Sequence, residues 1–352
     1  METFSRAEVR LALRNREMPL EALALEVTPT GMHYLLSHFD IPMVDPSTWR
    51  LEIGGLVERP TSLGLEELRR LPATTEPVTL ECAGNGRSLM TPRHEGQPWH
   101  LGGVSTARWT GVRLADLLVE VGVRDGAVDV AFTGADEGIE EGVRQAYAWG
   151  LPIAEALRTD LLLAFEMNGR LLEPQHGAPL RLVVPGWYGM ASVKWLTRIE
   201  VLAAPFDGPQ PASYRTVQRE DDTGEPISRI GPRALMIPPG VADDDDEQLA
   251  RVVDADILRL TGRAWSGLGP IERVEVSADG GVTWIDAALG TPPGPAAWVS
   301  WNAEVSLAGS AERHELCARA TDASGATQPD APVWNLWGYV NDAIQRVAVR
   351  RA

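Results

Sequence analysis

Short apolar runs, each closed after a few residues by glycine, proline or a charged side chain, recur along the whole of this 352-residue chain. Its 34 glycines and 26 prolines favour frequent turns between short strands. At about 150 residues per domain, the length is sufficient for two domains that each bury a core. The pattern therefore predicts two globular domains rich in β-structure, and it excludes a coiled coil or a wholly disordered chain.

The first two hundred residues alternate strand-like runs with amphipathic helical segments. The strand-like runs are 49–57, 78–82, 128–133, 161–166 and 180–184. Leucines spaced three residues apart predict a helix over 65–71 that ends at Pro72, and a second helix over 113–121 ends at Gly122. We therefore expect a mixed α/β domain over residues 1–205, including an N-terminal extension at 1–25.

The rest of the chain divides into two parts. Residues 206–256 are rich in proline, glycine and acidic residues, and we interpret them as a connector. Their acidic block at 243–247 lacks the ligand spacing of a calcium loop, so a solvated loop is the favoured interpretation. Short alternating segments at 257–260, 271–277, 282–287, 298–301 and 315–320 predict an all-β, immunoglobulin-like sandwich over 257–352. The expected fold class is α+β.

The charge balance restricts the partners of this protein. The chain has 49 acidic and 32 basic residues, a net charge of −17. Such a surface repels nucleic acids and anionic lipids, so an anionic ligand needs a local positive pocket. No apolar run approaches the ~20 residues that span a bilayer. The N-terminal residues are charged and resemble no secretory signal, so the expected location is cytoplasmic, without nucleic-acid or membrane partners.

A cysteine stands where a strand-like run meets a glycine-rich loop. Residues 78–87 read VTLECAGNGR, which places Cys82 at the junction and Arg87 five residues later. Backbone amides freed by Gly84 and Gly86, together with the guanidinium, would lower the pKa of the thiol and attract anions. Cys82 could therefore be a nucleophile, a metal ligand or a buried core residue.

A second loop and strand, over 175–196, offers hydrogen-bond donors near its turns: His176, Arg181 and Lys194. Three such donors suit a ligand that carries a phosphate. From the residues alone, Arg181 could also extend into solvent and Lys194 could be a surface lysine. The six histidines lack the regular spacing of a zinc site, and Cys317 is expected to be a small buried hydrophobe.

The two segments together resemble the sulfite oxidase family of molybdenum enzymes. The motifs that carry the resemblance are CAGNGR at 82–87, HGAPLR at 176–181, VPG at 184–186 and VKWL at 193–196. Supporting blocks are HFDIP at 38–42, PW at 98–99 and WTGV at 109–112, then GRAWSG at 262–267, VEVS at 274–277, DGGVTW at 279–284 and WN at 334–335. The resemblance covers nearly all of residues 25–350.

This resemblance implies a cofactor and a reaction. In the family, the cysteine thiolate binds molybdenum beside the two dithiolene sulfurs of molybdopterin, a role that Cys82 takes here. The residues implied to contact the pterin and its phosphate are His38, His176, Arg181 and Lys194, although His38 could also be a histidine held in a turn. The implied reaction is oxygen-atom transfer at molybdenum. No haem-binding domain is attached, so a separate electron carrier is expected, and the C-terminal domain implies a homodimer.

The chain departs from the family where the substrate binds. Two arginines of the family are replaced by Leu36 and Trp337, so only Arg87 of that set remains as a catalytic-site arginine. Sulfite carries two charges, and each charged hydrogen bond contributes ~1.5–3 kcal/mol, so we expect weak sulfite binding. A sulfoxide or N-oxide reductase is the nearest alternative, and a non-catalytic dimeric scaffold is another. The sequence leaves open whether Tyr214 or Tyr188 acts at the site.

Overall fold

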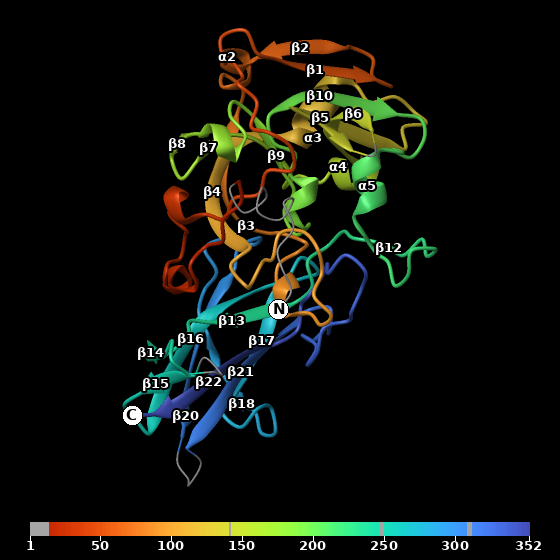
Figure 1. Ribbon diagram of the computed structural model, residues 1–352. Helices are drawn as coiled ribbons and strands as arrows, with labels where there is room; N and C mark the ends of the chain where they lie inside the picture. The colour runs from red at the N-terminus through yellow and green to blue at the C-terminus, as the bar shows by residue number, and fades with distance from the viewer. Residues whose placement is uncertain (1–13, 141, 247–249, 308–311) are drawn as a thin grey trace.

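The computed structural model describes residues 14–140, 142–246, 250–307 and 312–352. Most regular structure in these residues is β-strand, and the α-helices are short. Figure 1 shows two sheet-rich units placed end to end, the N-terminal unit at the top and the C-terminal unit, largely blue, at the bottom. The mixed α and β character expected of the first unit is therefore realised as a mostly β structure with few helices.

Two sheets build the N-terminal unit. The first has the order β2-β1-β10-β5-β6 and comprises β1 (Arg50–Gly55), β2 (Thr61–Gly64), β5 (Asp129–Glu140), β6 (Val143–Pro152) and β10 (Leu196–Leu202). The second has the order β3-β4-β7-β8, with β9 paired to β7, and comprises β3 (Ala73–Glu81), β4 (Val104–Arg113), β7 (Leu162–Met167), β8 (Arg170–Leu171) and β9 (Arg181–Val183). All five strand-like runs predicted in this region form strands.

The helices of this unit are small packing elements. The predicted helix at 65–71 forms over α2 (Leu65–Leu68), and the one at 113–121 forms over α3 (Leu114–Val121). Gly122 ends α3 at φ +72°, a left-handed conformation that suits glycine. Two more short helices are α4 (Ile153–Ala156) and α5 (Pro209–Ser213). One continuous apolar core joins both sheets, for example Phe132 of β5 with Leu163 of β7.

Two further sheets form the C-terminal unit around a second apolar core. One has the order β13-β16-β20-β19 and comprises β13 (Arg233–Met236), β16 (Ile257–Trp265), β19 (Ala288–Leu289) and β20 (Val299–Ser306). The other has the order β14-β15-β22-β21-β17-β18 and comprises β14 (Val241–Ala242), β15 (Arg251–Val253), β17 (Ile271–Ser277), β18 (Ile285–Asp286), β21 (Arg313–Asp322) and β22 (Gln345–Arg351). Cys317 is a free, fully buried cysteine of this core region.

The segment 206–256 differs from the expected connector. It contains the hairpin β11 (Arg215–Thr216) and β12 (Glu225–Pro226), and it contributes β13, β14 and β15 to the sheets of the C-terminal unit. Its acidic block is not simply solvated either. Asp243 pairs with Arg350 at 2.5 Å and Asp246 pairs with Arg313 at 2.6 Å, which anchors the described part of the block to β22 and β21. Opposite charges on neighbouring strands offset the like-charge repulsion that the sequence suggested.

The two units meet along the end of β3. The backbone N–H of Thr79 donates to Ala296 O at 2.9 Å, and the N–H of Trp298 donates to the hydroxyl of Thr79 at 2.8 Å. The residue that follows β3 is Cys82, so the predicted site lies where both units contribute walls. No helix within the described residues has the length and apolarity needed to cross a membrane.

Candidate cofactor and substrate site

A tight turn holds the cysteine that follows β3. The N–H of Cys82 donates to Gly103 O at 2.8 Å, and the N–H of Asn85 returns to Cys82 O at 2.9 Å. Gly86 adopts φ +85°, which lets the chain reverse before Arg87 begins a short 3-10 helix. The glycine-rich sequence therefore folds as the motif suggested, with Cys82 at the strand end and Arg87 beside it.

Burial dominates the chemistry of the thiol. The amide of Gly84 donates to Cys82 Sγ at 3.4 Å, and this bond together with Arg87 favours the thiolate. Desolvation is larger, however, and raises the pKa of the Cys82 thiol to about 11. The sequence-based expectation of a lowered thiol pKa was therefore wrong for the protein alone. A metal cation at Sγ would reverse this balance, because a coordinating thiol is deprotonated outright.

Arg87 is positioned by both units. Its Nε donates to Trp337 O at 2.9 Å, and its Nη1 donates to Gln97 O at 3.2 Å. The guanidinium carbon lies 5.0 Å from the centroid of the Tyr339 ring. Trp337 and Tyr339 belong to the chain between β21 and β22, so the C-terminal unit supplies part of the wall around Arg87.

Four cationic or imidazole groups line one cavity near this turn: the buried His33, His176 and Arg181 and the partly buried Lys194. Arg181 donates to the carbonyls of His176 at 3.2 Å and Ser192 at 3.1 Å, and its guanidinium lies 4.7 Å from the Trp109 ring centroid. Lys194 Nζ donates to Leu36 O at 2.7 Å and Gln175 O at 3.1 Å. The structure thus brings together the three donors that the second motif predicted, and His33 joins them.

Arg181 and Lys194 supply the positive charge of this cluster, whereas the lowered pKa values of His33 and His176 keep both imidazoles neutral at pH 7. Burial, with repulsion from Arg181 and Lys194, lowers the pKa of His176 to about 3. Burial alone lowers the pKa of Arg181 to about 10. Burial, with repulsion from Arg181, lowers the pKa of Lys194 to about 7, and the pKa of His33 also falls well below its ordinary value. Lowered pKa values at several neighbouring bases indicate a site built for an anion that neutralises them.

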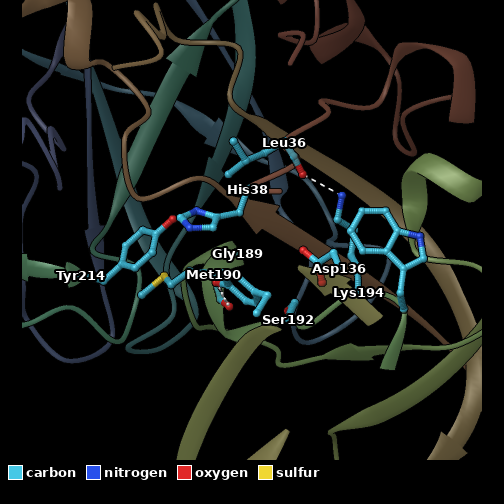
Figure 2. Close-up of a pocket in the computed structure, with 10 residues that line it drawn as sticks. Leu36, His38, Asp136, Gly189, Met190, Ser192, Lys194 and Tyr214 are labelled. Carbon is cyan, nitrogen blue, oxygen red and sulfur yellow. Dashed lines mark hydrogen bonds between the residues drawn. The ribbon is translucent and has the colours of Figure 1, made fainter. Parts of the chain in front are cut away.

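His38 lines an adjoining cavity that Lys194 also lines (Figure 2). Its Nε2 is 2.8 Å from Glu140 Oε1, so it bridges its loop to the end of β5. This hydrogen bond is the main cause that lowers the pKa of Glu140. The cavity is also lined by Leu36, Asp136, Tyr147, Met190 and Tyr214. His38 is therefore near the cluster of cations but is not part of it.

Several residues of the site were missed by the sequence analysis. Asp136 of β5 is buried, and its Oδ1 has no hydrogen-bond partner among the described residues. Burial raises the pKa of its carboxyl to about 6, although Lys194 opposes this shift. His33 Nε2 likewise has no partner within the described ranges. Neither residue lies in a motif, so only the fold reveals them.

Three tyrosines surround the side of the site that contains the thiol: Tyr147, Tyr214 and Tyr339. Burial raises the pKa of each phenol, and each interacts electrostatically with Cys82. The rings of Tyr214 and Tyr339 stack with centroids 5.2 Å apart. Tyr188, in contrast, lies near Glu81 and Asp342 and lines neither cavity described above. Of the two candidates left open, Tyr214 is the one placed at the site.

Comparison with known proteins identifies the architecture. Residues 38–210 match the oxidoreductase molybdopterin binding domain, and residues 240–352 match the Mo-co oxidoreductase dimerisation domain. Sulfite oxidase of Gallus gallus is 38% identical over 351 residues, which are 94% of this chain and 75% of that protein. The mitochondrial sulfite oxidase of Mus musculus is 36% identical over 359 residues, 96% of this chain and 64% of that protein.

The fold agrees with these matches. The sulfane dehydrogenase SoxCD from Paracoccus pantotrophus has a solved structure that aligns with a TM-score of 0.80 at 28% identity, covering 98% of this chain and 85% of that chain. The chain spans about two thirds of the length of the mouse enzyme. A buried cysteine turn beside a cationic cavity, two matching domains and close relatives together show that this chain belongs to the sulfite oxidase family of molybdopterin-binding oxidoreductases.

Proposed function

We propose that this protein is a molybdenum-cofactor-dependent, sulfite oxidase-like enzyme that transfers an oxygen atom to a small sulfur compound. The observation that carries this proposal is the juxtaposition of a buried cysteine turn with four bases that line one cavity and form no ion pair with another described residue. Its substrate, its electron acceptor and the roles of single residues are part of the proposal.

The side chains present fit the cofactor. Molybdopterin carries a phosphate and a polar pterin, which suit Arg181, Lys194 and His176 together with the unpartnered atoms of His33 and Asp136. His38 lies at the edge of this set and would contact the pterin from the adjoining cavity. A soft thiolate suits molybdenum, so Cys82 is the proposed ligand. Within the described residues, no three His, Cys, Asp or Glu side chains form a metal cluster, so other ligands would come from the cofactor.

The bound cofactor would supply the oxygen transfer and accept two electrons, while the protein binds and orients the substrate. Arg87 is the proposed catalytic arginine, because its guanidinium faces the tyrosine side of the site and can hold an oxyanion. Tyr214 would donate a hydrogen bond, since its raised pKa keeps the phenol protonated. The hydroxyl of Tyr147 already donates to Met190 O at 2.8 Å, so that phenol would contribute packing. Buried walls exclude water from the reacting atoms.

A second candidate is a reductase of sulfoxides or N-oxides, which runs the same chemistry in the other direction. The observation that favours it is the aromatic and apolar lining of Leu36, Met190 and the tyrosines, which suits a neutral substrate better than a dianion. Assays with artificial dyes, offering sulfite and a sulfane sulfur compound for oxidation and a sulfoxide for reduction, distinguish the two candidates.

The C-terminal unit is proposed to be an immunoglobulin-like sandwich that forms a homodimer. The two sheets around one core and the match to a dimerisation domain support this proposal. Light scattering should give twice the 38.2 kDa mass of the chain. A separate electron carrier is proposed as the redox partner.

Cofactor content and activity, measured on the same purified protein, test the proposal as a whole. Purified protein is analysed for molybdenum and for extractable pterin, and the loaded fraction is assayed with each dye. We expect close to one molybdenum and one pterin per chain, with turnover that scales with metal content. Protein that is produced in a cofactor-synthesising host and contains neither group would favour the non-catalytic scaffold instead.

A further inference from the structure

A fully buried ion pair connects the two units directly behind the cysteine turn. Glu81, the last residue of β3, has no exposed surface, and its Oε1 accepts a hydrogen bond from Nη1 of Arg233 in β13. Trp265 Nε1 of β16 donates to Glu81 Oε2 at 2.8 Å. These two partners of the carboxylate come from the first sheet of the C-terminal unit.

The same carboxylate extends to the turn itself. Asn85 Nδ2 donates to Glu81 Oε1 at 2.9 Å, and Asn85 Oδ1 accepts from the N–H of Gly103 at 2.9 Å. Gly103 in turn accepts the N–H of Cys82 through its carbonyl. Consecutive residues of a strand point to opposite faces, so Glu81 projects toward the C-terminal unit while Cys82 projects toward the cofactor site. Arg233 is thus linked to the backbone of Cys82 through Glu81, Asn85 and Gly103.

A second set of contacts holds the far side of the turn. The N–H of Val340 donates to Ala83 O at 2.7 Å, and Asn341 Nδ2 donates to Gly86 O at 2.7 Å. Val340 adopts φ +54°, an unfavourable conformation for a β-branched residue that persists only where surrounding contacts impose it. The C-terminal unit therefore fixes the turn from both sides.

A buried ion pair is rarely the most stabilising choice at such a position. Apolar residues of similar volume often give equal or greater stability, because the charges must be desolvated. What the pair supplies is one charged hydrogen bond from Nη1 of Arg233 to Oε1 of Glu81, while Nε and Nη2 of Arg233 have no partner among the described residues. The pair also lies one residue from the proposed metal ligand, where geometry matters most.

We infer that Arg233 is a positioning residue for Cys82, which acts through Glu81 and Asn85 to hold the turn that presents the thiol to the cofactor. This inference rests on the proposed role of Cys82 as the molybdenum ligand. It assigns to the C-terminal unit a part in shaping the metal site that is separate from dimerisation.

The two cysteines of the chain provide the test. Loaded enzyme is treated with iodoacetamide at one fixed pH, and the labelling rates of Cys82 and Cys317 are compared by mass spectrometry. Cys317 is buried in β21, so it reports global unfolding, whereas the ratio of the two rates reports local opening of the turn. Arg233→Met should raise the ratio by ~5-fold or more and alter the electron paramagnetic resonance spectrum of the half-reduced metal.

Arg263→Met is the matched control. Arg263 of β16 also crosses between the units, where it donates to Leu23 O at 2.8 Å and Ala24 O at 3.2 Å, and among the described residues none of its hydrogen bonds reaches the turn. Its ratio and spectrum should equal those of the wild type. If Arg233→Met is unstable, the double variant Glu81→Gln with Arg233→Met removes both buried charges and should fold while keeping the raised ratio.

A ratio and a spectrum that stay at wild-type values in the folded double variant, with metal bound, would overturn the inference. Equal acceleration of both cysteines in Arg233→Met would do the same, because it shows general destabilisation only. Failure of the proposed function would appear differently, as a lack of molybdenum in every protein including the wild type.

Discussion

The proposed cofactor side and the proposed substrate side of this site differ in how much charge they offer. The cofactor side contains His33, His176, Arg181 and Lys194, whose pKa values are all lowered by burial, with Asp136 as the nearby carboxyl. Among the described residues, the proposed substrate side has one guanidinium, that of Arg87, whose Nε and Nη1 already donate to backbone carbonyls, together with Tyr147, Tyr214 and Tyr339. The difference indicates that the proposed cofactor pocket is better suited to an anion than the proposed substrate pocket.

The largest expected effect is at the boundary between the two sides. Cys82→Ser replaces a soft sulfur by a hard oxygen and should lower turnover by about three orders of magnitude. Steady-state kinetics with a dye acceptor measures the loss, and extracted pterin should remain near the wild-type amount because other residues hold it. Wild-type turnover of the variant with the metal still bound would show that Cys82 is not a metal ligand, and Cys82 would then not mark the boundary between the two sides.

The cofactor side can be tested through Lys194, which is the only lysine in the sequence. Selective ¹³C labelling therefore gives one lysine side-chain signal in a nuclear magnetic resonance titration. In cofactor-free protein we expect a pKa of about 7, which burial and Arg181 cause. Binding of the cofactor phosphate should raise it by ~2 units, a 100-fold gain in proton affinity.

The same shift has a consequence for stability. Because the pKa of Lys194 in the folded protein lies below its ordinary value of 10.5, the unfolded chain binds more protons between pH 7 and 10. Cofactor-free protein should therefore become more stable as the pH rises from 7 to 9, a window in which Asp136 is already ionised. Chemical denaturation should show this slope in the wild type and a flatter one in Lys194→Met. A titration midpoint near 10.5 would contradict the positive charge inferred for the cluster.

Adding a positive charge to the proposed substrate side tests whether missing charge limits sulfite binding. Leu36 lines both cavities, and Leu36→Arg would keep the backbone carbonyl that accepts from Lys194. If the guanidinium returns one charged hydrogen bond of ~1.5 kcal/mol, the KM for sulfite should fall ~10-fold. Leu171→Arg, at an exposed position of β8, is the control for surface charge. Tight sulfite binding by the wild type would show instead that the tyrosines and Arg87 suffice.

The smallest effect is expected at the phenols. Tyr214→Phe removes one donor from the substrate side and should lower kcat by ~5-fold with little change in fold. Tyr188→Phe alters a phenol near Glu81 that lines neither cavity, so its kcat should match the wild type. Equal losses in the two variants would mean that the aromatic residues contribute packing alone.

Sequence predicted those parts of the site that lie within one continuous motif. Cys82 and Arg87 share a turn, and the three donors of the second motif meet in one cavity, because each set is close in the chain. His33, Asp136 and Tyr339 arrive from other elements, and no local pattern signals such long-range placement. The thiol pKa was predicted in the wrong direction because burial, which depends on the complete fold, outweighs the neighbouring donors.

The strands show the same difference between what local sequence predicts and what depends on distant residues. Strand positions followed from apolar runs, since a run fixes its own local conformation. The sequence did not predict that β13, β14 and β15 contribute to the C-terminal sheets. Proline, glycine and acidic residues interrupt the apolar pattern there, and these strands are stabilised by pairing with other strands. Arg350 and Arg313, which hold the acidic block, lie far along the chain and were not recognisable as its partners.

The hydrogen bond from Arg87 to the carbonyl of Trp337 also has a consequence for chimeras made between this protein and its relatives. A gene that joined the first part of this protein to the second part of a relative would pair a turn with a loop that had not been selected together. Chimeras should therefore lose catalytic competence even when both halves fold, unless the exchange carries residues 82–87 and 335–342 as one inherited block. In this protein, the two segments that meet at the boundary between the units must be exchanged together, although they are far apart in the sequence.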